Sequence, residues 1–431
     1  MKQVILGGGL SAISAAYFLQ EQTELDEILI LEREERPGGL CRSLVKDGYT
    51  YDIGPHILFS KDKEMLSLML SVLEEKNDLR RSNQIIYKGQ YVQYPFENDL
   101  SKLPKEDLEY CVTNFVHNPY EEYPAGNMLQ FFLKTFGEGI TNTYLRPYNE
   151  KIWKYDPCFM DTQMVDRIPR PTQEEILRSA SGETVDGYVH QLYFSYPAAG
   201  GIEAVVQGFM KKLGPKCRLR CAQNITSVKR QEGCFEVTVN GETIQAQRLM
   251  STIPVQELAQ VYDVPDEVQK CVDGLRYNSI IIAFVRTKED LSGEHFAFMN
   301  PEKEIIFHRI SKMDFLGKAY ESGSATYMVE ITYRQGDYTD SLSDQALRER
   351  IEEGLQKIGF IRHREDMELV NLTRHPYAYV IYDLNHRENM ERIREYFGTQ
   401  GIVLNGRFGN FEYWNMDRVI RESKKRADGG G

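Results

Sequence analysis

The segment Gln3-Val4-Ile5-Leu6-Gly7-Gly8-Gly9-Leu10-Ser11-Ala12 near the start of the chain decides the class of fold. Its apolar run from Val4 to Leu6 is typical of a buried strand, and residues 10–20 have the pattern of a helix. Glycines between a strand and a helix let the backbone approach a pyrophosphate, which the helix N-terminus attracts. We therefore predict a Rossmann-like α/β unit. Its candidate dinucleotide contacts are Gly7, Gly9 and Ala12.

Glu32 supports this interpretation. It directly follows the second apolar run, Ile28 to Leu31. An acidic side chain at this place can accept hydrogen bonds from a ribose diol. The alternative is a tight turn followed by a solvated glutamate, which explains the glycines but not their place at the start of the chain.

The composition limits the classes of function. The chain has 431 residues, of which 41% are hydrophobic and 27% charged, as in a globular protein of two or three domains. Its 52 Lys and Arg against 64 Asp and Glu give a net charge of −12, which repels nucleic acid. A phosphorylated ligand therefore needs a local cluster of basic side chains. The 7 cysteines lack metal-site spacing, so we expect free thiols and no metal.

We expect a cytoplasmic protein without a membrane span. No apolar stretch approaches the roughly 20 residues that a span requires. Met1 and Lys2 lead directly into the first expected strand, without the charged start and hydrophobic segment of a secretory leader.

A second glycine-rich segment, Arg36-Pro37-Gly38-Gly39-Leu40-Cys41-Arg42-Ser43, follows Glu32. Two glycines allow close backbone passage beside a diphosphate, and Arg42 can add a charge-assisted hydrogen bond. The segment resembles the second FAD signature of the flavoprotein superfamily of amine oxidases, protoporphyrinogen oxidases and UDP-galactopyranose mutases. Residues 406–409 with Met416 and Asp417 resemble its third FAD contact. The resemblance implies FAD, held additionally by Gly38, Gly39, Leu40, Arg42, His56, Ile57, Val228, Gly406, Arg407, Met416 and Asp417.

Patterning along the chain predicts three domains. Residues 100–170 carry longer helical patterns, and a hairpin with Asn240-Gly241 at its turn is followed by further β-rich runs. We expect an α/β, Rossmann-like FAD-binding domain from residues 1–85, 196–272 and 396–431. A helical insertion domain for the substrate nucleotide is expected at residues 100–170. An antiparallel β-sheet domain is expected from residues 86–99, 171–195 and 273–395.

Two further segments resemble UDP-galactopyranose mutases. Residues 51–60, Tyr-Asp-Ile-Gly-Pro-His-Ile-Leu-Phe-Ser, resemble the loop that carries a histidine beside the isoalloxazine, here His56. Residues 144–153, Tyr-Leu-Arg-Pro-Tyr-Asn-Glu-Lys-Ile-Trp, resemble the segment whose aromatic residues hold the uridine and whose tryptophan, Trp153, lies near the sugar. Tyr144 and Tyr148 share one face of a helix and can pinch a flat base. The alternatives are that His56 is a histidine of the core and that the aromatic residues of 144–153 form a stripe packed into the core.

Two arginines are candidates for a diphosphate, because guanidinium groups grip its oxygens bidentately. Phe307-His308-Arg309-Ile310-Ser311 resembles the mutase segment whose arginine holds the diphosphate. Asp166-Arg167-Ile168-Pro169-Arg170 resembles the second clamp, although the family's arginine falls one residue later, at Pro171. Arg170 is therefore a candidate shifted in register.

The remaining candidates are also implied by the resemblance. Tyr379 and Tyr413 match mutase tyrosines that hydrogen-bond the phosphates, with Tyr379 expected just before a helix. Tyr188 lies in a stretch similar to one that contacts uracil. Glu97 stands where the family tends to have an asparagine that touches the sugar. A carboxylate there can select a different pattern of hydroxyls.

The resemblance implies a flavin-dependent nucleotide-sugar mutase that interconverts a UDP-hexopyranose and its furanose form through a sugar adduct at N5 of reduced FAD. His56, Arg309 and Arg170 then serve catalysis through positioning and electrostatics. A reductant such as NAD(P)H or a reductase, a role in cell-surface polysaccharide biosynthesis and a homo-oligomer accompany this expectation. The alternatives are an FAD-dependent oxidase or dehydrogenase of the amine oxidase or protoporphyrinogen oxidase type, and a non-catalytic flavin-binding partner in glycan assembly.

Overall fold

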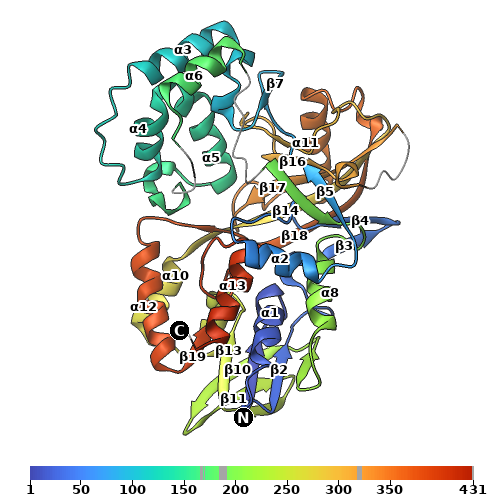
Figure 1. The fold of residues 1–431 in the computed structure, drawn as a ribbon, viewed down its shortest axis with the longest axis vertical. Helices are drawn as coiled ribbons and strands as arrows, with labels where there is room; N and C mark the ends of the chain where they lie inside the picture. Colours follow the sequence, from blue (N-terminus) through green and yellow to red (C-terminus); the bar gives the residue numbers. More distant parts are fainter. Residues whose placement is uncertain (166–167, 169, 184–191, 318–322, 430–431) are drawn as a thin grey trace.

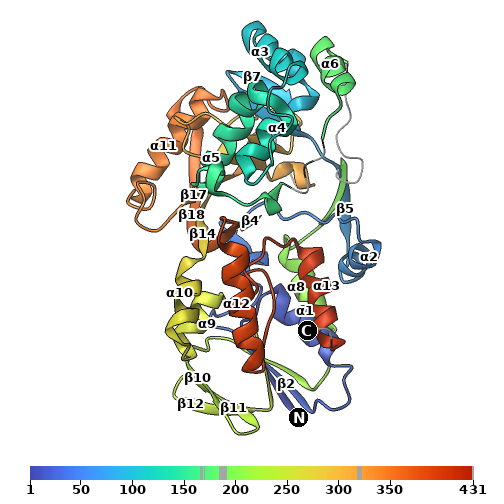
Figure 2. The ribbon, with the colours of Figure 1, turned by 90° about the vertical axis from the view of Figure 1, so that its left-hand side faces the viewer.

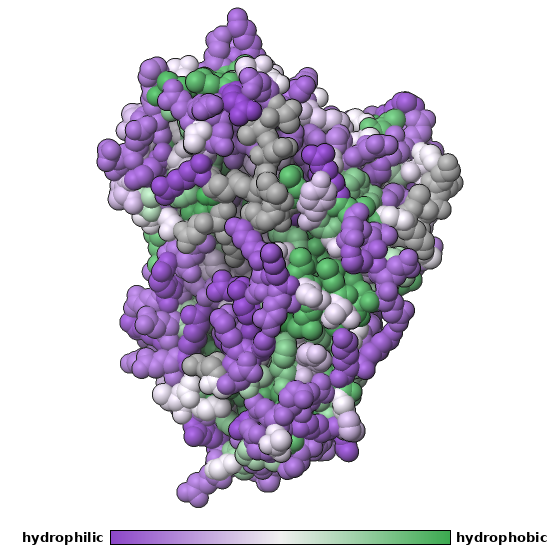
Figure 3. All heavy atoms as spheres, in the orientation of Figure 1, coloured by the Kyte–Doolittle hydropathy of each residue, from purple (hydrophilic) through white to green (hydrophobic). Residues whose placement is uncertain are grey.

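The computed structural model describes residues 1–165, 168, 170–183, 192–317 and 323–429 (Figure 1). The lower half of the molecule in Figure 1 is built on a parallel sheet, and the upper half on a group of helices beside a larger, mainly antiparallel sheet. Hydrophilic residues cover most of the face seen in this orientation (Figure 3). Within the described ranges, no helix combines the length and the apolarity needed to cross a lipid bilayer.

The parallel sheet has five strands in the order β19-β13-β1-β2-β9. Both of its faces are covered, which explains the continuous apolar runs read from the sequence. Val4 and Leu6 of β1 pack into one core, and Ile5 packs into the core on the opposite face. The strands are β1 (Lys2–Leu6), β2 (Glu27–Leu31), β9 (Cys217–Arg220), β13 (Arg248–Ser251) and β19 (Ile402–Leu404).

Helices α1, α8 and α13 lie on one side of this sheet, and α9, α10 and α12 on the other (Figure 2). The three-stranded sheet β10-β11-β12 packs with the second group. In its expected hairpin turn, Asn240 and Gly241 both have positive φ, at 49° and 82°, as a type I′ turn requires. The bounds are α1 (Leu10–Leu19), α8 (Glu203–Lys211), α9 (Val255–Val261), α10 (Asp266–Gly274), α12 (His386–Thr399), α13 (Met416–Ala427), β10 (Ile225–Gln231), β11 (Cys234–Val239) and β12 (Glu242–Ala246).

The upper sheet has seven strands in the order β18-β14-β17-β16-β15-β6-β7. Only the β15–β6 pairing is parallel among these described strands. Helix α11 (Asp344–Lys357) covers one face, and the helical group meets the other. The strands are β6 (Asn83–Tyr87), β7 (Gln90–Gln93), β14 (Arg276–Thr287), β15 (Ala297–Met299), β16 (Arg309–Lys312), β17 (Ala325–Tyr333) and β18 (Met367–Ile381).

The helical group contains α3 (Lys105–Val116), α4 (Met128–Ile140), α5 (Arg146–Trp153) and α6 (Gln173–Ser181), with the π-helical turn η4 (Thr141–Leu145) before α5. Helices α3 and α4 approach closely, since a Cβ on Gly139 would lie 2.5 Å from the Cα of Cys111. The smaller connecting elements are α2 (Lys63–Ser71), β3 (Ser43–Lys46), β4 (Tyr49–Asp52), β5 (Lys76–Arg80) and β8 (Tyr193–Pro197).

The expected domain boundaries stay a proposal, and the packing differs from them at two places. Helix α6 falls in a stretch expected to belong to the antiparallel sheet, but it packs on α3 and η3 (Leu100–Lys102). Strand β6 begins within residues expected in the FAD-binding domain, but it pairs with β15 of the upper sheet. Both differences arise because short segments between long elements carry no periodicity that reveals their partner.

Candidate functional site

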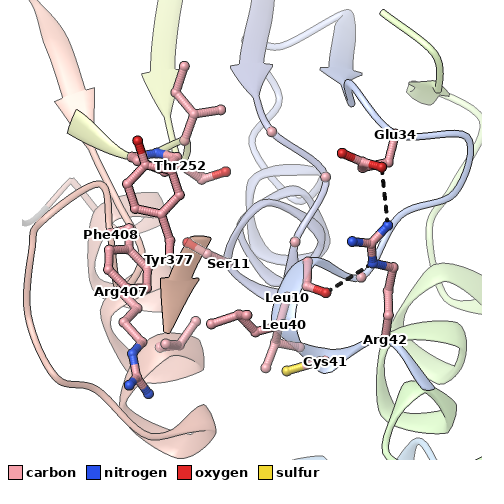
Figure 4. Close-up of a pocket in the computed structure, with 18 of the residues that line it drawn as sticks. Leu10, Ser11, Glu34, Leu40, Cys41, Arg42, Thr252, Tyr377, Arg407 and Phe408 are labelled. Carbon is pink, nitrogen blue, oxygen red and sulfur yellow. Dashed lines mark hydrogen bonds and ion pairs between the residues drawn. The ribbon is translucent and has the colours of Figure 1, made fainter. Parts of the chain in front are cut away.

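A cavity of about 930 Å³ opens at the carboxyl ends of the parallel strands (Figure 4). Gly7, Glu32 and Thr252, which follow β1, β2 and β13 directly, all line it. This edge is where open parallel sheets bind ligands, and the volume lies at the upper end of the range for small-molecule sites. The size therefore suits a dinucleotide.

Two glycine segments meet at the floor of the cavity. The amide of Gly38 donates to the carbonyl of Gly8 at 2.9 Å, and a Cβ on Gly39 would lie 3.2 Å from the Cα of Gly9. Gly7, at φ 91°, would place a Cβ 2.7 Å from Thr252 Oγ1. The backbones of the two segments approach closely because the residues at this contact are glycines. They form a cradle at the N-terminus of α1 for a diphosphate.

Glu32 is buried beside this cradle and fixed by the backbone. One carboxylate oxygen accepts the amide of Gly8 at 2.5 Å, and the other accepts the amide of Glu34 at 2.9 Å. Arg42 also lines the cavity. Its Nε donates to the Gly39 carbonyl at 3.2 Å, and its Nη1 lies 3.7 Å from a carboxylate oxygen of Glu34 (Figure 4). Both side chains are therefore oriented for polar contacts in the cavity.

Most of the expected cofactor residues line the cavity, and three do not. Ala12 and Val228 are buried in the cores, and Gly406 lies behind α1, where a Cβ would meet Ser11 Oγ at 2.6 Å. Ala12 and Gly406 therefore permit close packing. The expected residues that line the cavity are Gly7, Gly9, Glu32, Gly38, Gly39, Leu40, Arg42, His56, Ile57, Arg407, Met416 and Asp417.

Other lining residues were missed from the sequence. Thr252, Ile253 and Pro254 follow the third parallel strand, so a strand assignment at β13 could have found them. Residues 373–377 of β18 and Trp414 carried no such signal.

Five buried polar atoms of residues that line the cavity have no hydrogen-bond partner within the described structure. They are Ser11 Oγ, His56 Nδ1, Gln223 Oε1, Arg407 Nε and Trp414 Nε1. Buried polar atoms are normally paired, so this group indicates a polar ligand.

His56 is held by its own backbone turn, in which its amide donates to the Gly54 carbonyl at 2.9 Å. Burial, together with the cationic Arg407 and Arg309, lowers the pKa of its imidazole to about 4. The ring is therefore neutral at neutral pH. It suits a hydrogen-bond partner better than a general base.

A second cluster adjoins the cavity through Arg407. The guanidinium of Arg407 lies 4.2 Å from the ring centroid of Tyr413, whose ring stacks on Tyr379 at 6.0 Å. Trp153 meets both tyrosines edge-on, at 5.7 and 5.9 Å. The structure thus brings together three aromatic residues from α5, β18 and the loop before α13. The sequence predicted Tyr379 just before a helix, whereas it lies within β18.

Arg309 completes this cluster. Its Nε and Nη2 donate to the two carboxylate oxygens of Glu330 at 2.7 and 2.6 Å, and its Nη2 lies 3.3 Å from the Tyr379 hydroxyl. Glu330 is fully buried and was not expected from the sequence. Burial lowers the pKa of the Arg309 guanidinium, but the Glu330 charge outweighs it and holds that pKa well above its usual value.

The expectation that Tyr144 and Tyr148 pinch a base is wrong. Their rings stack on each other, with centroids 5.3 Å apart and planes 16° apart, which leaves no room for a third ring. Tyr144 also stacks on Phe96 at 4.8 Å and is 3% exposed. Because the two rings share a helix face, they stack on each other instead of on a ligand.

Glu97 lies beside these rings in the short turn η2 (Phe96–Asn98). Burial raises the pKa of its carboxyl to about 7. Arg170 is exposed, and its guanidinium lies 5.8 Å from the ring of Phe131. No interaction between described residues joins Arg170 to the Arg309 cluster. Tyr188 lies outside the described residues.

The family model for flavin-containing amine oxidoreductases matches residues 10–397. The chain belongs to this family. A crystal structure of reduced UDP-galactopyranose mutase matches 99% of this chain and 94% of its own, with a TM-score of 0.90 and 25% identity. The fold class, the resemblance and FAD as the cofactor are thereby confirmed.

Curated relatives of this chain include oxidoreductases. A coproporphyrinogen III oxidase of Staphylococcus aureus is 28% identical over 123 residues, which are 28% of this chain and 26% of that protein. A 4,4'-diapophytoene desaturase of Staphylococcus aureus is 27% identical over 157 residues, or 34% of this chain and 29% of that protein. The chain thus matches less than a third of the length of each.

Proposed function

We propose that this chain is a flavin-dependent nucleotide-sugar mutase that interconverts a UDP-hexopyranose, similar to UDP-galactopyranose, and its furanose form. The observation that carries the proposal is the Arg309 cluster next to the flavin cavity, where a fixed guanidinium and three aromatic side chains meet. The TM-score of 0.90 to a mutase supports the same reading.

The FAD fits the residues present. The glycine cradle would hold its diphosphate, and Glu32 its ribose. Ser11, His56, Arg407 and Trp414 offer polar atoms that a ligand can pair. Reduced flavin supplies a nucleophilic ring nitrogen, so the protein itself needs no nucleophile.

The protein's own task is to position the sugar and to stabilise the departing diphosphate. Arg309 is suited to this because Glu330 fixes its guanidinium in one plane, while its Nη1 donates to no protein atom among the described residues. Tyr379 adds a hydroxyl group 3.3 Å from Nη2 of Arg309, and the ring of Tyr413 stacks on Tyr379. Such prepared donors need little reorganisation when charge develops on the leaving group.

His56 would contact the flavin and would not move a proton. A neutral imidazole with a pKa of about 4 is a weak base near pH 7. Its unpaired Nδ1 can hold a hydrogen bond on the flavin side of the sugar.

A second candidate is an FAD-dependent oxidase or dehydrogenase, because the curated relatives are an oxidase and a desaturase. The flavin cavity is common to both candidates, so only the Arg309 cluster separates them. A non-catalytic flavin-binding partner in glycan assembly is the third candidate. It has no structural observation in its favour.

Several companion expectations stay part of the proposal. They are a nucleoside-diphosphate sugar as substrate, reduction by NAD(P)H or a reductase, a cytoplasmic location, a homo-oligomer, a role in cell-surface polysaccharide biosynthesis, and substrate contacts by Trp153, Tyr148, Glu97, Tyr188 and Arg170.

Assays on one preparation separate the first two candidates. The mutase proposal predicts that the dithionite-reduced protein converts UDP-galactofuranose to UDP-galactopyranose in the absence of oxygen. Release of hydrogen peroxide with an amine or a porphyrinogen, and no sugar isomerisation, would establish the oxidase instead. Flavin-fluorescence competition with UDP-, GDP- and dTDP-sugars then identifies the base.

A further inference from the structure

Tyr382 directly follows β18 and has no part in the function proposed above. It is 3% exposed and is not among the described residues that line the flavin cavity. Side chains alternate between the two faces of a strand. Tyr379 accordingly packs into the core of the helical group and the upper sheet, whereas Tyr382 packs into a core of the parallel sheet. The end of β18 thus presents one tyrosine to the Arg309 cluster and another to the opposite side.

The hydroxyl of Tyr382 binds the loop that carries Tyr413. It accepts the amide of Tyr413 at 2.7 Å and donates to a carboxylate oxygen of Glu412 at 2.7 Å. The other carboxylate oxygen of Glu412 accepts from Nη2 of Arg394 on α12 at 2.6 Å. The Tyr382 hydroxyl therefore joins two consecutive residues of the loop to the end of β18.

The same loop has a turn that needs support from its surroundings. Phe411, which precedes Glu412, has φ 50°, a left-handed conformation that is unfavourable for a residue with a side chain. Its carbonyl accepts from Nε2 of His386 on α12 at 2.8 Å. The amide of Glu412 donates to the carbonyl of Arg407 at 2.7 Å, which closes the turn. Contacts from α12 and from Tyr382 thus hold this turn in place.

The ring of Tyr413 lies where the flavin cavity meets the Arg309 cluster. The guanidinium of Arg407, which lines the cavity, lies 4.2 Å from the centroid of this ring. The ring also stacks on Tyr379 and meets Trp153 edge-on. A shift of the loop backbone would move the ring relative to all three neighbours. The position of the Tyr413 backbone therefore sets the shape of the cluster on this side.

We propose that Tyr382 is a positioning residue of the substrate site. Its hydroxyl fixes the backbone of Tyr413, and the ring of Tyr413 is thereby held between Arg407 and Tyr379 for contact with the diphosphate of the substrate. The inference rests on the proposed function. Contacts that are already in place need little ordering when a ligand binds, and a small displacement weakens them. Because Tyr382 is buried behind the loop, it acts through Tyr413 and not by touching the nucleotide.

Calorimetric titration of the FAD-loaded protein with UDP tests this in wild type, Tyr382→Phe and the control Tyr262→Phe. Tyr262 belongs to the same core, is 6% exposed and donates its hydroxyl to Gln400 at 3.0 Å, so the control also loses one hydrogen bond. We expect Tyr382→Phe to weaken UDP binding about three- to tenfold and Tyr262→Phe to leave it unchanged. Equal affinities of Tyr382→Phe and wild type would overturn the role of Tyr382. An equal loss in Tyr262→Phe would overturn it as well.

A double-mutant cycle with Tyr413→Ala distinguishes positioning from a general effect on the fold. If Tyr382 acts through Tyr413, adding Tyr382→Phe to Tyr413→Ala should change the UDP affinity by less than about twofold. A loss by the same factor as in the wild-type background would show that Tyr382 does not act through Tyr413, and would contradict the proposal.

Should Tyr382→Phe fail to retain FAD, Arg394→Gln replaces it, since this change removes the ion pair that holds Glu412 from the side of α12. Its control is Arg392→Gln, which alters an exposed ion pair on the same helix. We then expect a loss of UDP affinity in Arg394→Gln alone, and equal affinities of the two variants contradict the proposal. If wild type itself binds no UDP, the proposed function fails, whereas the outcomes above overturn only the role of Tyr382.

Discussion

Arg309 and Glu330 stand opposite each other in the register of β16 and β17 and form a bidentate ion pair at 2.7 and 2.6 Å. Glu330 is fully buried, whereas the Arg309 side chain is 25% exposed. The carboxylate therefore fixes the guanidinium, and the exposed edge of the guanidinium remains available to a ligand.

Replacement of Arg309 by alanine should have two separable effects. Loss of a charge-assisted contact should weaken UDP binding by about 1.5 to 3 kcal/mol. Loss of the partner should also leave Glu330 buried and unpaired, which costs about 3 to 5 kcal/mol of folding free energy. Calorimetric titration measures the loss of UDP affinity, and denaturant unfolding measures the loss of stability.

The double variant Arg309→Ala/Glu330→Gln separates these effects, because it should recover much of the stability but none of the affinity. Arg392→Ala is the control. It breaks an exposed ion pair with Glu388 and should change neither the stability nor the UDP affinity. Full UDP affinity in Arg309→Ala would show that Arg309 does not touch the nucleotide.

Glu97 should make stability depend on pH. Burial raises the pKa of its carboxyl from 4.5 to about 7 in the folded state, so the folded state binds this proton more tightly than the unfolded state. The free energy of unfolding contributed by this group therefore falls as pH rises from about 4.5 to 7, by up to about 3 kcal/mol. Relative to wild type, Glu97→Gln should gain stability over this range.

Chemical denaturation of both proteins between pH 5 and 8 measures that difference. Glu395→Gln, at an exposed position of α12, is the control and should run parallel to wild type. A constant gap between Glu97→Gln and wild type would contradict a raised pKa.

His56 should make the free energy of unfolding fall toward low pH, which is the opposite of the effect of Glu97. Its folded pKa of about 4 lies below the ordinary 6.5, so its contribution to stability is complete above pH 6.5 and is lost as pH falls toward 4. His56→Asn should remove this acid-sensitive part of the stability. Melting temperatures of the two apoproteins between pH 4.5 and 7.5 should converge at low pH, and parallel curves would exclude this effect.

Gly39→Ala should impair FAD binding more than it impairs folding. Its φ of 55° disfavours any side chain by about 1 to 2 kcal/mol, and its Cβ would lie 3.2 Å from Gly9 Cα within the diphosphate cradle. Gly233→Ala is the matched control, since it has φ 77° with nothing within 4 Å of a Cβ. Flavin content after purification should fall only in Gly39→Ala.

The sequence allowed prediction where function depends on local geometry. Gly7, Gly9 and Glu32 belong to one strand–turn–helix–strand unit, so their spacing was enough to place them at one edge of the sheet. Arg309 was found by resemblance, but its partner Glu330 depends on the register of two strands, which short apolar runs do not reveal.

Residue spacing also did not distinguish a helix face that packs into the core from a helix face that binds a ligand. Tyr144 and Tyr148 do share one side of their helical segment, but that side packs into the core against Phe96.

The central claim is tested most directly by comparing the oxidised and the dithionite-reduced protein in turnover of UDP-galactofuranose, followed by chromatography of the UDP-sugars. The account predicts that reduced protein forms UDP-galactopyranose, that oxidised protein forms none, and that reoxidation in air abolishes the activity. Equal turnover by both forms, or no turnover by either with UDP bound, would contradict it.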